Sequence, residues 1–151
     1  MRHATRRDAL QQGSAFAALV ACGLVTAGQA QAAVDNAAFD AKTLADALKL
    51  LGSTADSKDV SITSPDIAEN GAVVPVSVTS KLAKTQEIYI LVEKNPQPLT
   101  ATFMIPEGTE PFVSTRVKMG QSSNVVAIVK ADGKLYSTTK ETKVTLGGCG
   151  G

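Results

Sequence analysis

Hydrophobic and polar residues alternate along most of the chain beyond residue 59. In the segment 74–79 three valines are separated by Pro, Ser and Thr, and the segments 87–92 and 100–105 show the same period of two. This period is typical of half-buried β-strands. The pattern predicts about seven strands, near residues 60–64, 72–80, 86–93, 100–105, 112–119, 123–130 and 134–145.

Turn sequences separate these segments, at Glu69-Asn70-Gly71, at 95–98, at Pro106-Glu107-Gly108 and at Asp132-Gly133. The last pair lies between two alternating segments, which favours a two-residue hairpin of type I′ because both residue types tolerate positive φ. The spacing of the strands predicts a mainly β fold, an immunoglobulin-like antiparallel β-sandwich.

One segment before the strands has a helical period instead. Apolar residues recur at positions 37, 41, 44, 48 and 51, after a possible cap at Asp35-Asn36 and before Gly52. The pattern predicts one N-terminal α-helix of about four turns, packed on one side of the sandwich. Together with the strands it gives a folded domain over residues 33–146.

Some apolar side chains fall on both faces of the predicted sheet. Val73 precedes Val74, and Leu91 lies between Ile90 and Val92. Either another protein covers this second face, or the N-terminal helix does. The sequence leaves both possibilities open.

The first 32 residues have the pattern of a cleaved export signal. The paired Arg6 and Arg7 precede an apolar stretch at 14–27, and Ala30-Gln31-Ala32 has the small-x-small form that a signal peptidase requires. The arginine pair is typical of the twin-arginine pathway of bacteria. We therefore expect cleavage between Ala32 and Ala33 and a periplasmic mature protein.

A second interpretation of the same segment is a lipoprotein signal. Leu19-Val20-Ala21-Cys22 has the form of a lipoprotein cleavage box, in which Cys22 would be acylated. The residues that follow stay small and apolar, whereas a lipoprotein usually continues with a polar tether.

Composition excludes several function classes. The chain has 151 residues, a formal net charge of +1 and no block of like charges, so neither nucleic acid nor a membrane surface is an expected partner. Without residues 1–32 it contains no histidine and one cysteine, Cys149. Metal sites built on His and Cys clusters, Ser-His and Cys-His nucleophile pairs and an intramolecular disulfide are therefore excluded, and we expect no cofactor and no metal.

The single cysteine stands among four glycines, in Gly147-Gly148-Cys149-Gly150-Gly151. Glycine pays the largest entropic cost on ordering, so this segment predicts a flexible, thin arm over residues 147–151. No helix terminus or base that would activate the thiol is built into the arm, although Lys140 and Lys143 are close in sequence. Cys149 is therefore expected to be an ordinary thiol on which other proteins act. The alternative is a cysteine without a function in a disordered glycine-rich tail.

The Gly-Gly-Cys-Gly-Gly sequence on a small, exported, β-rich chain resembles the SoxY family, the substrate-carrying subunits of SoxYZ complexes in bacterial thiosulfate oxidation. The resemblance covers signal, helix, sandwich and arm, with Ala9 departing from the usual aromatic of the twin-arginine signal. It implies that Cys149 is the covalent attachment point for sulfur intermediates and that the chain is not itself an enzyme. It also implies a heterodimer with a SoxZ-like subunit and transient encounters with SoxAX-, SoxB- and SoxCD-like enzymes.

Two other function classes stay open. Gly150-Gly151 superficially resembles the ubiquitin-like sulfur carriers, which need activation by ATP that an exported chain would lack. An exported immunoglobulin-like scaffold or adhesion module could instead hold Cys149 in a permanent disulfide with a partner. A stable, non-exchanging bond at that cysteine would favour the scaffold.

Overall fold

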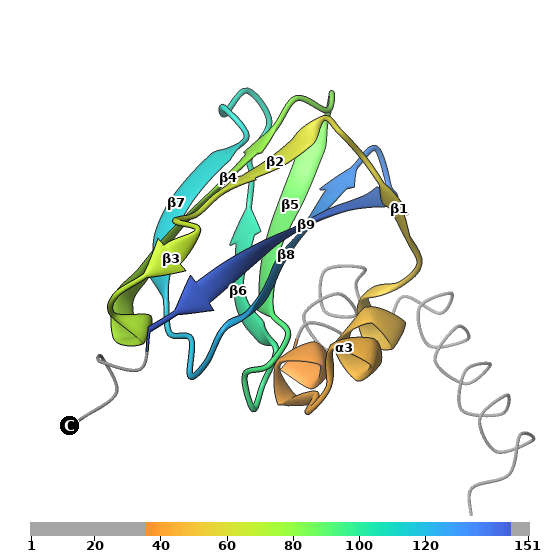
Figure 1. Cartoon of the computed structure of the whole chain (residues 1–151). Coiled ribbons are helices and arrows are strands. Elements are labelled where there is room, and N and C mark those ends of the chain that lie inside the picture. The colour runs from red at the N-terminus through yellow and green to blue at the C-terminus, as the bar shows by residue number, and fades with distance from the viewer. Residues whose placement is uncertain (1–35, 146–151) are drawn as a thin grey trace, which may run out of the picture. The chain divides into compact units, whose positions relative to one another are not determined.

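The computed structural model describes residues 36–145 of the chain. This part is mainly β, with a short helical segment at 36–40 and the helix α3 at its beginning (Figure 1). Its elements are α3 (Leu44–Leu51), β1 (Thr54–Asp56), β2 (Val60–Thr63), β3 (Ile67–Ala68), the 3-10 turn η1 (Gly71–Val73), β4 (Val74–Ser80), β5 (Thr85–Val92), β6 (Leu99–Met104), β7 (Phe112–Val117), β8 (Ser123–Ala131) and β9 (Lys134–Val144).

The strands form two sheets. The larger sheet has the order β1-β9-β8-β5-β6, with β3 also paired to β9, and the smaller has the order β2-β4-β7. Valines on the inner faces, such as Val76 of β4 and Val129 of β8, pack into one fully buried core between the sheets. Each buried valine contributes about 1.5 kcal/mol or more to the free energy of folding. The predicted immunoglobulin-like sandwich is confirmed.

The outer face of the larger sheet is apolar beside the helical segment. Leu91, Val126 and Ile128 pack there with Ala47 of α3 in a second buried cluster. The sequence had left open whether another protein or the N-terminal helix covers the second apolar face of the sheet. At Leu91, the helical segment covers it. Val73 belongs to a 3-10 turn, not to a strand, and half of it is exposed.

The prediction of one continuous helix of four turns was wrong. Residues 36–40 are helical, the chain then leaves the helical conformation at 41–43, and α3 begins at Leu44. The reason is a second cap, since Thr43 is extended and its side chain accepts a hydrogen bond of 3.1 Å from the backbone N–H of Asp46. Such a cap starts a new helix instead of continuing the old one. The predicted end at Gly52 is confirmed by its backbone bond to Leu48.

All seven predicted strands are present, and two more were missed. Both extra strands, β1 and β3, pair in parallel with β9, whereas the other pairs are antiparallel. They have three and two residues, too few to show an alternating pattern. The strand expected from residue 72 begins at Val74, because η1 occupies 71–73.

The predicted type I′ hairpin is confirmed at the start of β9. Asp132 and Gly133 both have positive φ, at 49° and 75°, and Ala131 pairs directly with Lys134. This turn fixes the register between β8 and β9 over nine residue pairs.

Candidate functional site

The residues that the sequence singles out for chemistry and processing lie outside the described part of the chain. These are Arg6, Arg7, Cys22, Ala32, Ala33, Gly147, Gly148, Cys149, Gly150 and Gly151. The described residue nearest to the cysteine in sequence is Thr145, directly after β9, so the end of this strand decides where the glycine-rich segment begins. The candidate site therefore consists of the end of β9 and its surroundings.

The end of β9 is held on one side by the segment 64–69, which runs alongside it (Figure 1). The backbone N–H groups of Lys143 and Thr145 donate to the carbonyl oxygens of Asp66 and Ala68, at 2.9 and 3.0 Å. A buried hydroxyl pair adds to this, because Ser64 Oγ lies 2.8 Å from Thr142 Oγ1. The backbone is thus paired up to the last described residue.

On its other side the strand end is held by one side chain. Ser122 precedes β8, and its Oγ accepts a hydrogen bond of 2.9 Å from the backbone N–H of Val144. The same hydroxyl lies 3.4 Å from the carbonyl oxygen of Val144. A single serine therefore extends the β8–β9 pairing, whose last register pair is Ser123 with Thr142, toward the glycine-rich segment.

Gly71 closes the arrangement from a third direction. A Cβ atom at this position would lie 2.4 Å from the carbonyl oxygen of Met119 and 2.8 Å from Cγ1 of Val144. The Met119 N–H also donates to the Gly71 carbonyl at 2.7 Å. Only glycine allows this approach. We call the segment 64–69, Gly71 and Ser122 together the clasp.

The lysines nearest to the cysteine in sequence differ in their surroundings. Lys140 Nζ donates to the carbonyl oxygen of Ser64 at 2.6 Å and forms an ion pair of 3.1 Å with Asp66. It therefore supports the clasp from within β9. Lys143 is exposed, and it lies opposite Ile67 in the register of β3 and β9.

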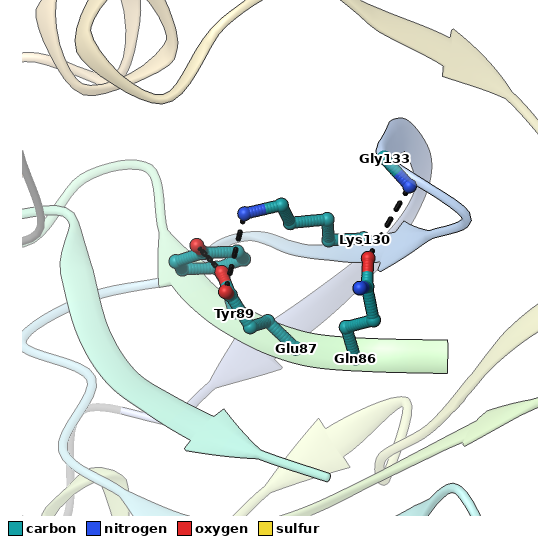
Figure 2. A network of polar contacts seen from close by, with 5 residues as sticks. All are labelled: Gln86, Glu87, Tyr89, Lys130 and Gly133. Atoms are coloured by element: carbon teal, nitrogen blue, oxygen red, sulfur yellow. Dashed lines mark hydrogen bonds and ion pairs between the residues drawn. The ribbon is translucent and has the colours of Figure 1, made fainter. Parts of the chain in front are cut away.

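A second polar cluster lies at the other end of β9 (Figure 2). The carboxylate of Glu87, which is 5% exposed, accepts from the Tyr89 hydroxyl and from Lys130 Nζ, the latter at 3.2 Å. Beside it, Gln86 Oε1 accepts from the backbone N–H of Gly133 in the hairpin at 3.2 Å. The buried carboxylate is thus paired and hydrogen-bonded, as a stable buried charge requires.

Within residues 36–145, no group of three or more His, Cys, Asp and Glu side chains could hold a metal ion. No helix in the same range is long and apolar enough to cross a membrane.

The clasp itself was not predicted from the sequence. Asn70-Gly71 was interpreted as a turn, and neither Ser122 nor the segment 64–69 carries a motif. Their roles depend on partners about 20 to 80 positions away in the chain: Ser122 bonds to Val144, and Ser64 to Thr142 at a separation of 78 residues. No local pattern encodes such contacts.

Comparisons with known proteins agree with the family resemblance. The family model described as "Sulfur oxidation protein SoxY" matches residues 47–149, so the match reaches Cys149. A solved structure, the sulfur carrier protein SoxY from Chlorobium limicola f thiosulfatophilum, is 37% identical with a TM-score of 0.63, and the match covers 71% of this chain and 96% of that one.

A superoxide reductase (neelaredoxin) from Ignicoccus hospitalis is similar in fold alone, at 19% identity and a TM-score of 0.51, over 60% of this chain and 83% of its own. No curated protein sequence matches the chain. The family match covers more than half of the sequence, and its solved relative shares both the sandwich and more than a third of the aligned residues. The chain belongs to the SoxY family of sulfur oxidation proteins.

Proposed function

We propose that this chain is a covalent carrier of sulfur intermediates in periplasmic thiosulfate oxidation, and that Cys149 is the attachment point. The observation that supports the proposal most is the family match, which reaches Cys149, the one cysteine after residue 32. The solved relative at 37% identity is itself described as a sulfur carrier. The clasp adds a physical argument, because it gives the glycine-rich segment a fixed point of departure at Thr145.

Loading would be an oxidative step. The Cys149 thiol and thiosulfate would form a sulfur–sulfur bond, which gives a cysteine S-thiosulfonate and releases one proton and two electrons. A SoxAX-like haem enzyme would accept the electrons. Cysteine suits this role because sulfur bound to sulfur stays exchangeable, so that one thiol can be loaded and freed repeatedly.

Release would be hydrolytic. A SoxB-like hydrolase would add water across the bond between the outer sulfur and the sulfonate, which yields sulfate, two protons and a persulfide on Cys149. A SoxCD-like dehydrogenase would oxidise the persulfide further. The carrier itself contributes the thiol and its presentation, and the enzymes contribute catalysis.

The proposed pathway requires export and a partner subunit. Arg6 and Arg7 would direct the chain to the twin-arginine pathway, which transports folded proteins, and cleavage would leave Ala33 as the first residue. A SoxZ-like subunit without its own signal would be exported in the same complex.

The decisive experiment measures the intact mass of the mature protein from cells grown on thiosulfate. We expect sulfur adducts on the protein and their complete loss in Cys149→Ser. Folding should be unchanged, because serine is close to cysteine in size and the sandwich ends before this segment. Reduction should return the unmodified mass. A permanent disulfide at Cys149, or adducts that persist in the serine variant, would contradict the proposal.

The flanking glycines allow a control that keeps the thiol. Replacing Gly148 and Gly150 with Val adds β-branched bulk on both sides of Cys149, so transfer by every enzyme with a narrow active-site channel should slow. A small alkylating reagent should still label the cysteine at the normal rate. Normal turnover of this variant would show that the glycines do not serve channel entry.

Export of the protein is tested separately from its role as a sulfur carrier. Replacing Arg6 and Arg7 with Lys should retain the protein in the cytoplasm, and the mass of the wild-type mature protein should correspond to a start at Ala33. Unchanged export of the lysine variant would exclude the twin-arginine route. A lipid adduct on Cys22 would show that the chain is cleaved before Cys22 and anchored as a lipoprotein, and not cleaved before Ala33.

A further inference from the structure

Exposed side chains lie on the segment 64–69 of the clasp and next to the clasp, and they include two large apolar ones. Ile67 of β3 is 59% exposed and Val73 of η1 is 50% exposed. Asp66, Glu69 and Lys143 are exposed beside them. We call these five residues the collar: Asp66, Ile67, Glu69, Val73 and Lys143.

The collar lies close to the point where the glycine-rich segment begins. Ile67 is the register partner of Lys143, and the Thr145 N–H bonds to Ala68, the residue after Ile67. Val73 stands two positions after Gly71, whose Cα is packed against the Val144 side chain. Both apolar residues therefore belong to segments that directly hold the end of β9.

The chain between this fixed point and the cysteine is short. Cys149 comes four residues after Thr145, and four residues span at most about 14 Å when fully extended. The clasp leaves no slack upstream, because the N–H groups of Lys143, Val144 and Thr145 are all hydrogen-bonded. An enzyme that takes Cys149 into a recessed active site must therefore bring its surface up to the collar.

From these distances, and on the basis of the proposed function, we propose that the collar is the common docking surface for the enzymes that act on Cys149. The partner it fits is an enzyme whose active site opens through a channel with an apolar rim, which would cover Ile67 and Val73. The contact must be transient, since a subunit bound permanently at the collar would keep each enzyme from reaching the thiol.

Two other large exposed apolar residues of the described chain provide a matched control. Met104 and Phe112 are 68% and 49% exposed, and they flank the connection between β6 and β7 at the outer edges of the two sheets. They thus have comparable exposure and belong to strands that do not pair with β9.

The test compares two double variants of the full-length carrier, purified with any subunit that accompanies it. In the sulfate-releasing reaction on thiosulfate-loaded carrier, Ile67→Thr with Val73→Thr should raise KM about tenfold and leave kcat unchanged, because ground-state docking is weakened. Met104→Thr with Phe112→Thr should leave KM unchanged. Threonine preserves β-branching at the first pair, and the exposure of these side chains keeps folding intact.

A variant with a longer segment between β9 and Cys149 tests whether the collar acts by docking the enzyme. About six Gly and Ser residues inserted between Leu146 and Gly147 add up to about 20 Å of reach, so an enzyme could reach Cys149 without touching the collar. In this background the collar variant should lose most of its effect on KM. Equal KM values for wild type and collar variant, an equal increase in the Met104 and Phe112 control, or an undiminished effect in the long-arm background would each overturn the collar proposal. Absence of any sulfur adduct on the wild-type protein would instead refute the proposed function itself.

Discussion

The two ends of β9 are built in different ways. At its beginning, Asp132 and Gly133 form a two-residue turn that connects Ala131 at the end of β8 with Lys134 at the start of β9. These two turn residues have the positive φ values that such a turn requires. At its end, the strand is held by the clasp, whose parts come from before β4 and from the residue preceding β8. The first end is thus encoded locally, and the second depends on the folded sandwich.

The difference corresponds to a difference in proposed role. The hairpin end is stabilised by the Glu87 cluster and needs only to fix the register of the sheet. In the proposed function, the clasp end would keep the strand in place up to the start of the segment that presents Cys149 to other proteins. Substitutions that disturb the contacts of the clasp with the end of β9 should therefore affect both stability and sulfur transfer, whereas substitutions at the hairpin should affect stability alone.

The largest effect is expected for Gly71→Ala. The new Cβ would approach backbone of Met119 and the Val144 side chain far too closely, so the free energy of unfolding should fall by about 3 kcal/mol. Chemical denaturation measures this loss, and sulfur transfer should slow under conditions where the variant is still folded. Gly108→Ala is a control for added bulk, because no neighbouring atom lies within 4 Å of its Cβ position, and its φ of 82° should cost about 1 kcal/mol, as at Gly133. A loss no greater than in the control would show that the close approach is unimportant.

Glu87→Ala at the opposite end should destabilise somewhat less, by about 2 kcal/mol. It removes a buried carboxylate to which Tyr89 and Lys130 are bonded. Sulfur transfer by the folded variant should be unchanged. Glu87→Gln, which keeps an acceptor for the tyrosine, should cost less, and slower transfer in either variant would remove the functional contrast between the two ends.

Gly133→Ala tests the hairpin turn and should cost about 1 kcal/mol. Its φ of 75° is unfavourable for a residue with a Cβ, although the space around it is open. Asp132→Asn should be nearly neutral, since asparagine tolerates the same conformation. Thermal unfolding of both variants distinguishes backbone strain from loss of a side chain.

The smallest change in global stability is expected for Ser122→Ala, below about 1 kcal/mol, from the loss of the two hydrogen bonds of its hydroxyl to the Val144 backbone, of which one is long. Its local effect should be larger. Amide hydrogen exchange at Val144 should accelerate, while exchange in the middle of β9 stays slow. Ser122→Thr, which retains the hydroxyl, is the matched control, and unchanged exchange at Val144 in the alanine variant would mean that Ser122 does not hold the strand end.

The sequence by itself determined the elements whose signals are local. Alternation of apolar and polar residues, as in the segment 74–79, predicted the seven main strands, and Asp132-Gly133 predicted the hairpin. The glycine-flanked Cys149 indicated the family. These predictions succeeded because side-chain periodicity and turn conformation depend on neighbouring residues. The Thr43 cap is equally local, and the helix prediction failed because the apolar period was given more weight than the cap.

Only the tertiary structure decided how these elements are combined. It assigned the helix to the outer face beside Leu91, paired the two-residue strand β3 with β9, and made Gly71 and Ser122 into parts of the clasp. Each of these facts rests on contacts between residues far apart in the chain, and a pattern with a period of two or of 3.6 residues carries no information about such partners. The candidate attachment site, Cys149, could therefore be identified from the sequence. The contacts that hold the end of β9, from which its segment continues, could be identified only from the folded sandwich.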